Sequence, residues 1–222
     1  PGGAMEAALA AQQAGKVRFI GVTSHSIPMA MKLIRTGDFI SVQFPFNFIE
    51  TEAADELHPL ARELGVAIIG MKPFAGGAIT DASLAFKFLR SHADLFPIPG
   101  YDSVESVEQV VSFYGAPTSA SQKDFEEMAK VKAELGGEFC RRCEYCQPCP
   151  FGVAITGSMI YPLLASRMSP KVASNFAAAN LDTVPNCTEC GVCVTRCPYT
   201  LPIPAMLKKH YELYLEHRNA KE

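Results

Sequence analysis

The sequence predicts an α/β fold with a parallel sheet, followed by a mainly α-helical, cysteine-rich domain. Strand-like and helix-like segments alternate four times over residues 1–114. Each round takes roughly 25–30 residues, which is typical of βα units that build a parallel sheet. All eight cysteines then lie between residues 140 and 197, and no strand pattern appears after residue 140.

Four segments rich in apolar and β-branched residues are the predicted strands: 17–24, 39–49, 66–74 and 95–100. The strand at 66–74 is continuously apolar, which is typical of a strand buried on both faces. Four units in about 115 residues make half of an eight-stranded (β/α) barrel, which needs about 250 residues. The competing geometry is an open doubly wound sheet, but the glycine fingerprint of that fold is not found.

Helix-like segments precede and follow these strands, at 4–16, 27–37, 51–65, 83–93 and 103–115. Ser26 is expected to cap the second helix, with Pro28 near its start, and Ser103 to cap the fifth. Three further helices are expected at about 157–167, 170–180 and 203–218. The predicted domains are a half-barrel at 1–115, a linker and helix at 116–139, and a cysteine domain at 140–222.

Composition excludes several classes of protein. The chain is 48% hydrophobic and 19% charged, with a net charge of −3, so it carries no electrostatic footprint for nucleic acid. No apolar run is long enough to span a membrane and no secretion leader opens the sequence, so we expect a cytoplasmic protein. Because the first residue is proline and residues 1–16 resemble the interior of a protein, we also expect a fragment.

The cysteines form two runs that predict iron–sulfur clusters. The first is C-x2-C-x2-C-x2-C-P and the second is C-x2-C-x2-C-x3-C-P, the ligand spacing of bacterial ferredoxins. Three cysteines two residues apart let one tight loop reach three corners of a cubane, and a fourth arrives from another direction. The eight predicted ligands are Cys140, Cys143, Cys146, Cys149, Cys187, Cys190, Cys193 and Cys197.

Zinc and disulfides are the alternatives to clusters. Zinc favours two C-x2-C pairs from separate strands, and a three-cysteine loop crowds a single tetrahedral ion. Disulfides are disfavoured by the tight spacing and by a cysteine-free body of 139 residues, which indicates a reducing compartment. The assignment of ligands to clusters stays open. In two-cluster ferredoxins the fourth cysteine of each run, here Cys149 or Cys197, binds the cluster of the other run. Because the first run is shortened, Cys149 can instead bind the cluster of its own run.

The first 115 residues resemble the second half of an aldo/keto reductase. The segments GKVRFIGVTSHS, VQFPFNFIE, LGVAIIGMKPFAGG and FPIPGYDSVESVEQV follow one another as in that family, and the tail resembles the subgroup with a C-terminal iron–sulfur domain. The resemblance implies strands 5 to 8 of a (β/α)8 barrel. It also implies NAD(P)H bound at the carboxyl ends of these strands and a small-molecule carbonyl or alcohol substrate.

The resemblance also implies a set of cofactor-binding residues. Ser24, together with Thr23, and Gln43 would hold the nicotinamide carboxamide, although Gln43 can equally be a barrel-lining residue with an internal partner. Met71 would pack on the nicotinamide ring or belong to the core. Gly100 and Ser103 would bind phosphate at a helix start. Gln109 and Val110 stand where the family commonly has Glu-Asn, which implies altered or weaker dinucleotide binding.

No catalytic residue is assigned. The family's aspartate, tyrosine, lysine and histidine lie in the first half of its barrel. His25 is expected to be a capping or supporting residue. His58, His92, His210 and His217 are expected on solvent-exposed faces.

Two functions follow from these observations. The first is an oxidoreductase that couples NAD(P)H chemistry to two [4Fe-4S] clusters and exchanges electrons with a redox carrier protein. The second is a non-catalytic electron-transfer or structural iron–sulfur module on a degenerate barrel.

Overall fold

A computed structural model describes residues 3–115, 119–135 and 139–220. The chain divides into two compact units, Pro1–Glu134 and Leu135–Glu222. The boundaries expected from the sequence, at 115 and 139, remain predictions. Part of the expected linker, residues 116–118, lies outside the described residues.

The first unit is built on a four-stranded parallel sheet in the order β1-β2-β3-β4. The strands are β1 (Gly21–Thr23), β2 (Ser41–Pro45), β3 (Ala67–Met71) and β4 (Leu95–Ile98). All four lie within the segments predicted from sequence. The register aligns Thr23 with Gln43 and Pro45 with Met71, so the carboxyl ends of the strands meet at one edge of the sheet.

Three helices connect the strands: α2 (Ile27–Ile34), α3 (Leu57–Glu63) and α4 (Ala82–Leu89). Helix α1 (Ala4–Gln13) precedes β1, and α5 (Val104–Tyr114) follows β4. As predicted, Ser26 caps α2, where its side chain accepts a hydrogen bond from the Met29 amide, and Ser103 caps α5. Asp81 caps α4 in the same way, which the sequence analysis did not predict. Short 3₁₀ turns at Glu52–Ala54 and Ala75–Gly77 complete the connections.

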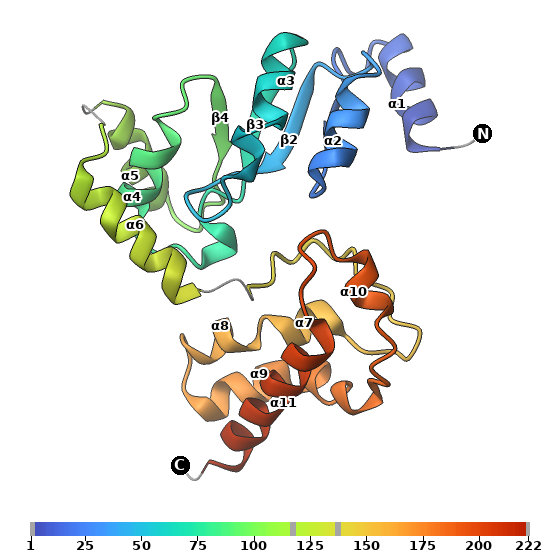
Figure 1. Cartoon of the computed structure of the whole chain (residues 1–222), viewed down its shortest axis with the longest axis vertical. Helices are drawn as coiled ribbons and strands as arrows, with labels where there is room; N and C mark the ends of the chain where they lie inside the picture. The colour runs from blue at the N-terminus through green and yellow to red at the C-terminus, as the bar shows by residue number, and fades with distance from the viewer. Residues whose placement is uncertain (1–2, 116–118, 136–138, 221–222) are drawn as a thin grey trace. The chain divides into compact units, whose positions relative to one another are not determined.

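The two faces of the sheet are unequally buried. Helices α2 and α3 pack beside β1, β2 and β3 (Figure 1). On one face, Val42, Phe44, Ile68 and Leu95 are buried. The alternate residues point the other way, and of these Phe96 is 77% exposed and Ile98 43% exposed. Because parallel sheets are normally covered on both faces, this second face is atypical of a complete α/β unit.

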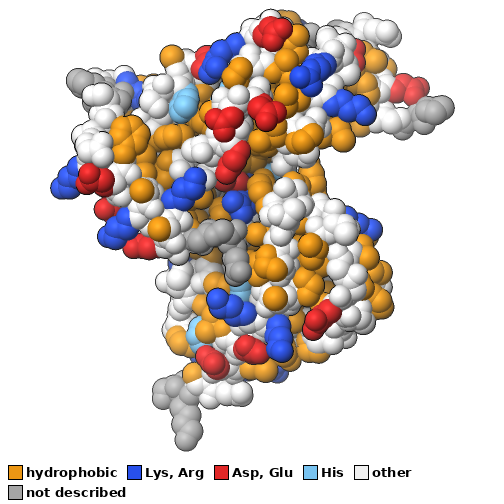
Figure 2. Space-filling model, viewed as in Figure 1, with side chains coloured by type: hydrophobic (Ala, Val, Ile, Leu, Met, Phe, Trp, Pro, Cys, Tyr) orange, Lys and Arg blue, Asp and Glu red, His pale blue; other side chains and the backbone are white. Residues whose placement is uncertain are grey.

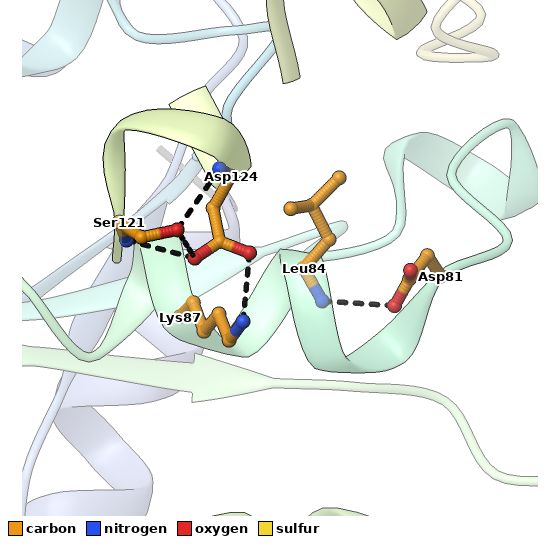
Figure 3. A network of polar contacts seen from close by, with 5 residues as sticks. All are labelled: Asp81, Leu84, Lys87, Ser121 and Asp124. Atoms are coloured by element: carbon orange, nitrogen blue, oxygen red, sulfur yellow. Dashed lines mark hydrogen bonds and ion pairs between the residues drawn. The ribbon is translucent and has the colours of Figure 1, made fainter. Parts of the chain in front are cut away.

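Helix α6 (Gln122–Leu135) is tied to α4 by a polar network (Figure 3). The Lys87 ammonium lies 2.7 Å from the Asp124 carboxylate. Ser121 donates to the same carboxylate through its hydroxyl and its amide, at 2.6 and 2.7 Å. The hydrogen bond from Lys87, followed by those from Ser121, holds the pKa of Asp124 well below its usual value. The start of α6 is therefore fixed to the first unit by charge-assisted contacts.

The expectation that the helical histidines are solvent-exposed is wrong for two of them. His58 is 1% exposed and His210 is 7% exposed. The ring of His58, on α3, packs 4.6 Å from the ring of Phe46, on the loop after β2. Its Nε2 atom has no hydrogen-bond partner among the described residues. Tertiary packing overrides the polarity of the side chain, because α3 turns this position toward the apolar core.

We expect the burial of His58 to make the first unit sensitive to acid. Burial, reinforced by the charges of His92 and Arg62, lowers the pKa of His58 from 6.5 to about 4. The folded state therefore resists protonation, so stability is complete above pH 6.5 and falls as the pH drops toward 4. The loss should reach up to about 3 kcal/mol.

Urea unfolding at several pH values tests this expectation. His58→Leu should remove the contribution of His58 to the loss of stability between pH 6.5 and 4 and leave the contributions of His25 and His92, whose pKa values are also lowered by burial. An unchanged pH dependence in His58→Leu would show that another group is responsible.

The described residues of the second unit form helices and loops and contain no strand. The helices are α7 (Ile155–Met159), α8 (Tyr161–Ala165), α9 (Pro170–Leu181), α10 (Val192–Arg196) and α11 (Ile203–Asn219). A 3₁₀ turn spans Val184–Asn186. Helix α10 lies inside the second cysteine run, where no helix was expected.

The core of the second unit lies between α7, α9 and α11 (Figure 1). Gly157 lets α7 approach α9, since a Cβ atom at this position would meet the Asn180 side chain at 2.4 Å. Tyr161 and Tyr214 are fully buried and meet edge to face, with ring centroids 5.8 Å apart. Buried Cys146 belongs to this core, and five other cysteines pack against it. The cysteine loops are therefore part of the packed interior.

No helix in the described ranges is long and apolar enough to cross a membrane. On the face shown in Figure 2, Lys and Arg side chains lie among Asp and Glu side chains.

Candidate functional site

The two cysteine runs adopt the same local backbone conformation. In the first, Arg142 and Glu144, on either side of Cys143, have φ angles of 53° and 65°. In the second, Glu189 and Gly191, on either side of Cys190, have φ angles of 56° and 76°. Left-handed residues are costly unless they are glycine, so three non-glycine residues are held there by the fold. Alternation of this kind forms backbone nests that receive anionic groups, iron–sulfur clusters included.

Four cysteines from both runs line the first of two cavities, which we call cavity A. Its cysteines are Cys140, Cys143, Cys146 and Cys197. Thus three consecutive cysteines of the first run meet the last cysteine of the second. The empty volume is about 340 Å³, part of it open to solvent. The Thr156 hydroxyl lies 4.0 Å from the Cys146 sulfur at this cavity.

Cavity B has the reciprocal composition. It is lined by Cys187, Cys190 and Cys193 of the second run together with Cys149, the last cysteine of the first. Cys146 also reaches its wall. The empty volume is about 370 Å³, again partly open to solvent. The two cavities thus divide the eight predicted ligands into two sets of four by exchanging the fourth cysteines.

Contacts between the runs hold this exchange in place. The guanidinium of Arg196, just before Cys197, donates to the Pro148 carbonyl, just before Cys149, at 3.0 Å. The guanidinium of Arg141 lies over the ring of Tyr199, 4.5 Å from its centroid. Each fourth cysteine therefore has a neighbour anchored to the other run.

All eight cysteines are free thiols in the structure. Burial, followed by the proximity of Cys140 and Cys143, raises the pKa of Cys146 to about 11. Burial and the neighbouring Cys187 and Cys190 likewise raise the pKa of Cys193. Crowded thiolates disfavour one another, so a bound cation must displace the protons and compensate the charge. Among the described residues, no three His, Cys, Asp or Glu side chains are grouped closely enough for a single metal ion.

The donor set fits iron–sulfur clusters. Each cavity presents at least four soft sulfur ligands, three of them from one nest-forming loop. Thiolates and backbone amides directed at the sulfurs are the environment that such clusters take.

The first unit brings together some of the residues expected to bind a nicotinamide. Gln43 donates from its side-chain amide to the Met71 sulfur at 3.5 Å, and Thr23 approaches the same sulfur at 4.0 Å. Met71 is buried, so the structure gives Gln43 an internal partner. Ser24 is buried, and its hydroxyl exchanges hydrogen bonds with the Ser26 backbone at 3.1 and 3.0 Å. The binding roles of these residues remain predictions.

Two backbone amides at the start of α5 donate to side chains of the helix itself. Ser103 accepts from the Ser106 amide at 3.1 Å, and the Ser106 hydroxyl receives the Ser103 amide at 3.3 Å, which forms a capping box. Gly100 is exposed just before this cap. Val110 is only 6% exposed and belongs to the buried core.

Sequence reasoning missed a set of buried hydrogen bonds made by the Asn47 side chain at the carboxyl edge of the sheet, which we call the brace. Asn47 is fully buried and its side-chain oxygen accepts from the amides of Ile49 and Glu50, at 2.9 and 3.0 Å. Its amide nitrogen donates to Glu50 Oε2 at 3.1 Å and to the Lys72 carbonyl at 3.0 Å. The sequence feature that indicates such a buried polar residue is the single amide side chain of Asn47 within the apolar run 44–49.

The brace supports a strained turn. Lys72, directly after β3, has a φ of 54°, which a non-glycine residue adopts only when its surroundings hold it. Burial, then the charge of Lys72, lowers the pKa of His25 to about 4, so His25 is neutral near pH 7. A lysine ammonium and a neutral imidazole therefore lie near the strand ends that are expected to face a cofactor.

Comparison with solved structures finds aldo/keto reductases. The chain is similar to aldo-keto reductase AKR11C1 from Bacillus halodurans in its holo form (18% identity, TM-score 0.47, 59% of this chain and 58% of that chain). The apo form of the same protein matches at 18% identity and TM-score 0.47, over 57% and 55%. A thermostable aldo-keto reductase, Tm1743, in complex with the inhibitor epalrestat, matches at 14% identity and TM-score 0.45, over 57% and 53%. The chain thus spans little more than half the length of these structures.

Comparison with curated proteins finds no match. The sequence profile of the aldo/keto reductase family matches residues 4–134, and that of a 4Fe-4S dicluster domain matches residues 139–202. The two profiles adjoin close to the division between the two compact units. The chain therefore belongs to the aldo/keto reductase family and carries an iron–sulfur domain of the 4Fe-4S dicluster type.

Proposed function

We propose that this protein is an iron–sulfur oxidoreductase that couples NAD(P)H-linked carbonyl or alcohol chemistry to electron transfer through two [4Fe-4S] clusters. The observation that carries the proposal is that the eight cysteines line two cavities, with four thiols in cavity A and the other four, together with Cys146, in cavity B. When bound, each cluster supplies one-electron chemistry at a potential tuned by its surroundings.

The proposal assigns the ligands in the exchanged pattern. Cavity A holds one cluster with Cys140, Cys143, Cys146 and Cys197. Cavity B holds the other with Cys149, Cys187, Cys190 and Cys193. The spacing of the runs left this open, and the cavity linings favour the exchange because each fourth cysteine lines the cavity of the other run.

We also propose that β1–β4 correspond to strands 5 to 8 of a (β/α)8 barrel. Consecutive parallel strands and one sparsely covered face support this assignment. The family's catalytic tetrad would then lie on the other half of the barrel, and we assign no catalytic residue within residues 1–222. The grouping of Thr23, Gln43 and Met71 at the carboxyl edge supports a nicotinamide site there.

A one-electron carrier protein is the proposed redox partner, and cavity B is the proposed contact. Cys190 is an exposed ligand, whereas Cys146 of cavity A is buried. Phe151, which also lines cavity B, is 46% exposed. An exposed ligand beside an exposed aromatic ring places the second cluster close to the surface that a carrier can reach.

Anaerobic reconstitution tests the cluster assignment. We expect about eight irons and about eight sulfides per chain, and a spin-coupled electron paramagnetic resonance (EPR) spectrum after reduction. Binding of NADH or NADPH to the reconstituted full chain, followed by fluorescence, tests the cofactor. Tightly held zinc without sulfide would overturn the proposed function.

A second candidate is supported by the start of α5. The capping box at Ser103 and the buried Val110 reduce what this helix can offer a dinucleotide. The protein would then be an electron-transfer or structural iron–sulfur module on a barrel without a nucleotide. Reduced clusters together with no detectable NAD(P)H binding would favour this candidate.

A further inference from the structure

One apolar side chain lines both cavities. Ile155, at the start of α7, contributes to the walls of cavity A and cavity B. It is 2% exposed, so it lies in the packed interior rather than at a rim. Cys146 is the only other residue that appears in both linings among the described residues of the chain. The two cavities therefore share part of their walls, which one predicted ligand and one isoleucine provide.

Two neighbouring residues provide a comparison, because each lines a single cavity. Ile203, at the start of α11, lines cavity A only, and Val153, just before α7, lines cavity B only. Both are 2% exposed, as Ile155 is. The three residues thus have the same burial and the same β-branched shape, and they differ in which cavity they face.

We propose that Ile155 is a positioning residue that forms the shared partition between the two cluster sites and sets the polarity felt by both clusters. This inference rests on the proposed two-cluster assignment. An apolar partition excludes water and offers no hydrogen bond to sulfur, and both conditions disfavour the more negative, reduced form of a cluster. A change at Ile155 should therefore act on both clusters at once, whereas a change at Ile203 or Val153 should act on one.

Threonine substitution separates these cases, because threonine keeps the β-branched shape of valine and shortens isoleucine by one carbon. A hydroxyl group that faces a cluster can donate to its sulfurs and stabilise the reduced form, which shifts the midpoint potential in the positive direction. In redox titrations followed by EPR, Ile155→Thr should shift both reduction waves. Ile203→Thr should shift one wave, and Val153→Thr should shift the other.

Iron and sulfide counts come first, and they distinguish the two levels of the proposal. If the unaltered full chain does not hold about eight irons, the proposed function fails and the partition fails with it. Suppose instead that the full chain does hold about eight irons. If Ile155→Thr then shifts only one wave, or Ile203→Thr shifts both, the proposed role of Ile155 is wrong and the proposed function stands.

A measurement on the unaltered protein avoids any dependence on how the variants fold. In isoleucine-methyl-labelled full chain loaded with iron and sulfide, nuclear magnetic resonance should show the Ile155 methyl signals responding to both reduction steps. The Ile203 signals should respond to one step. An Ile155 signal that follows a single step would overturn the inference.

Discussion

Replacement of Cys149 and Cys187 together by alanine should leave a protein that still binds about four irons. Both cysteines line cavity B, so the double substitution removes two ligands from one cluster and none from the other. Loss of two thiolates should abolish that cluster entirely, whereas a single substitution can leave a partly ligated one. Iron and sulfide analysis after anaerobic purification measures the result, and the EPR spectrum of the reduced protein should lose its spin coupling.

The matched control is a double substitution in which Cys143 is replaced instead of Cys187. Cys143 lines cavity A, so replacement of Cys149 and Cys143 together removes one ligand from each cavity and should damage both clusters. If each run instead completes its own cluster, the two results are reversed. The Cys149 and Cys143 pair would then keep about four irons, and the Cys149 and Cys187 pair would damage both clusters.

Asn47→Ala should destabilise the first unit by about 2–5 kcal/mol. The substitution leaves the buried amides of Ile49 and Glu50 without their acceptor. It also removes the donor that holds the Lys72 carbonyl and thereby frees a strained turn at the carboxyl edge of the sheet. Each orphaned buried amide costs roughly 1–3 kcal/mol, which is large compared with the net stability of a domain.

Two optical signals separate the units in the cluster-loaded protein. Far-ultraviolet circular dichroism follows all helices, whereas visible absorbance follows only the clusters. In urea, Asn47→Ala should move the first unit's transition to lower concentration and leave the loss of visible absorbance unchanged. Gln13→Ala, a truncation of an exposed amide on α1, is the control. A change of less than about 1 kcal/mol in Asn47→Ala would show that the brace does not stabilise the unit.

Much of the first unit was predictable because its signals are local. Apolar runs bounded by polar and glycine residues located all four strands, and Ser26 and Ser103 capped the expected helices. The spacing of the cysteines likewise indicated their chemistry, since three ligands on one loop are a property of the loop itself. Helix α10 was not predicted, because its five residues are fewer than a periodic pattern needs to be detected.

Features that depend on distant residues could not be predicted in the same way. The burial of His58 depends on Phe46 and on the rotation of α3, and the brace of Asn47 depends on the chain reversal that returns Lys72 to it. The pairing of Cys149 with the second run, and of Cys197 with the first, depends on how segments separated by some forty residues pack together. Periodicity and ligand spacing act over a few residues, so the local sequence was sufficient for most of the secondary structure and for the predicted ligand types. The partners of each buried side chain are chosen by packing across the whole unit, and only the folded chain shows them.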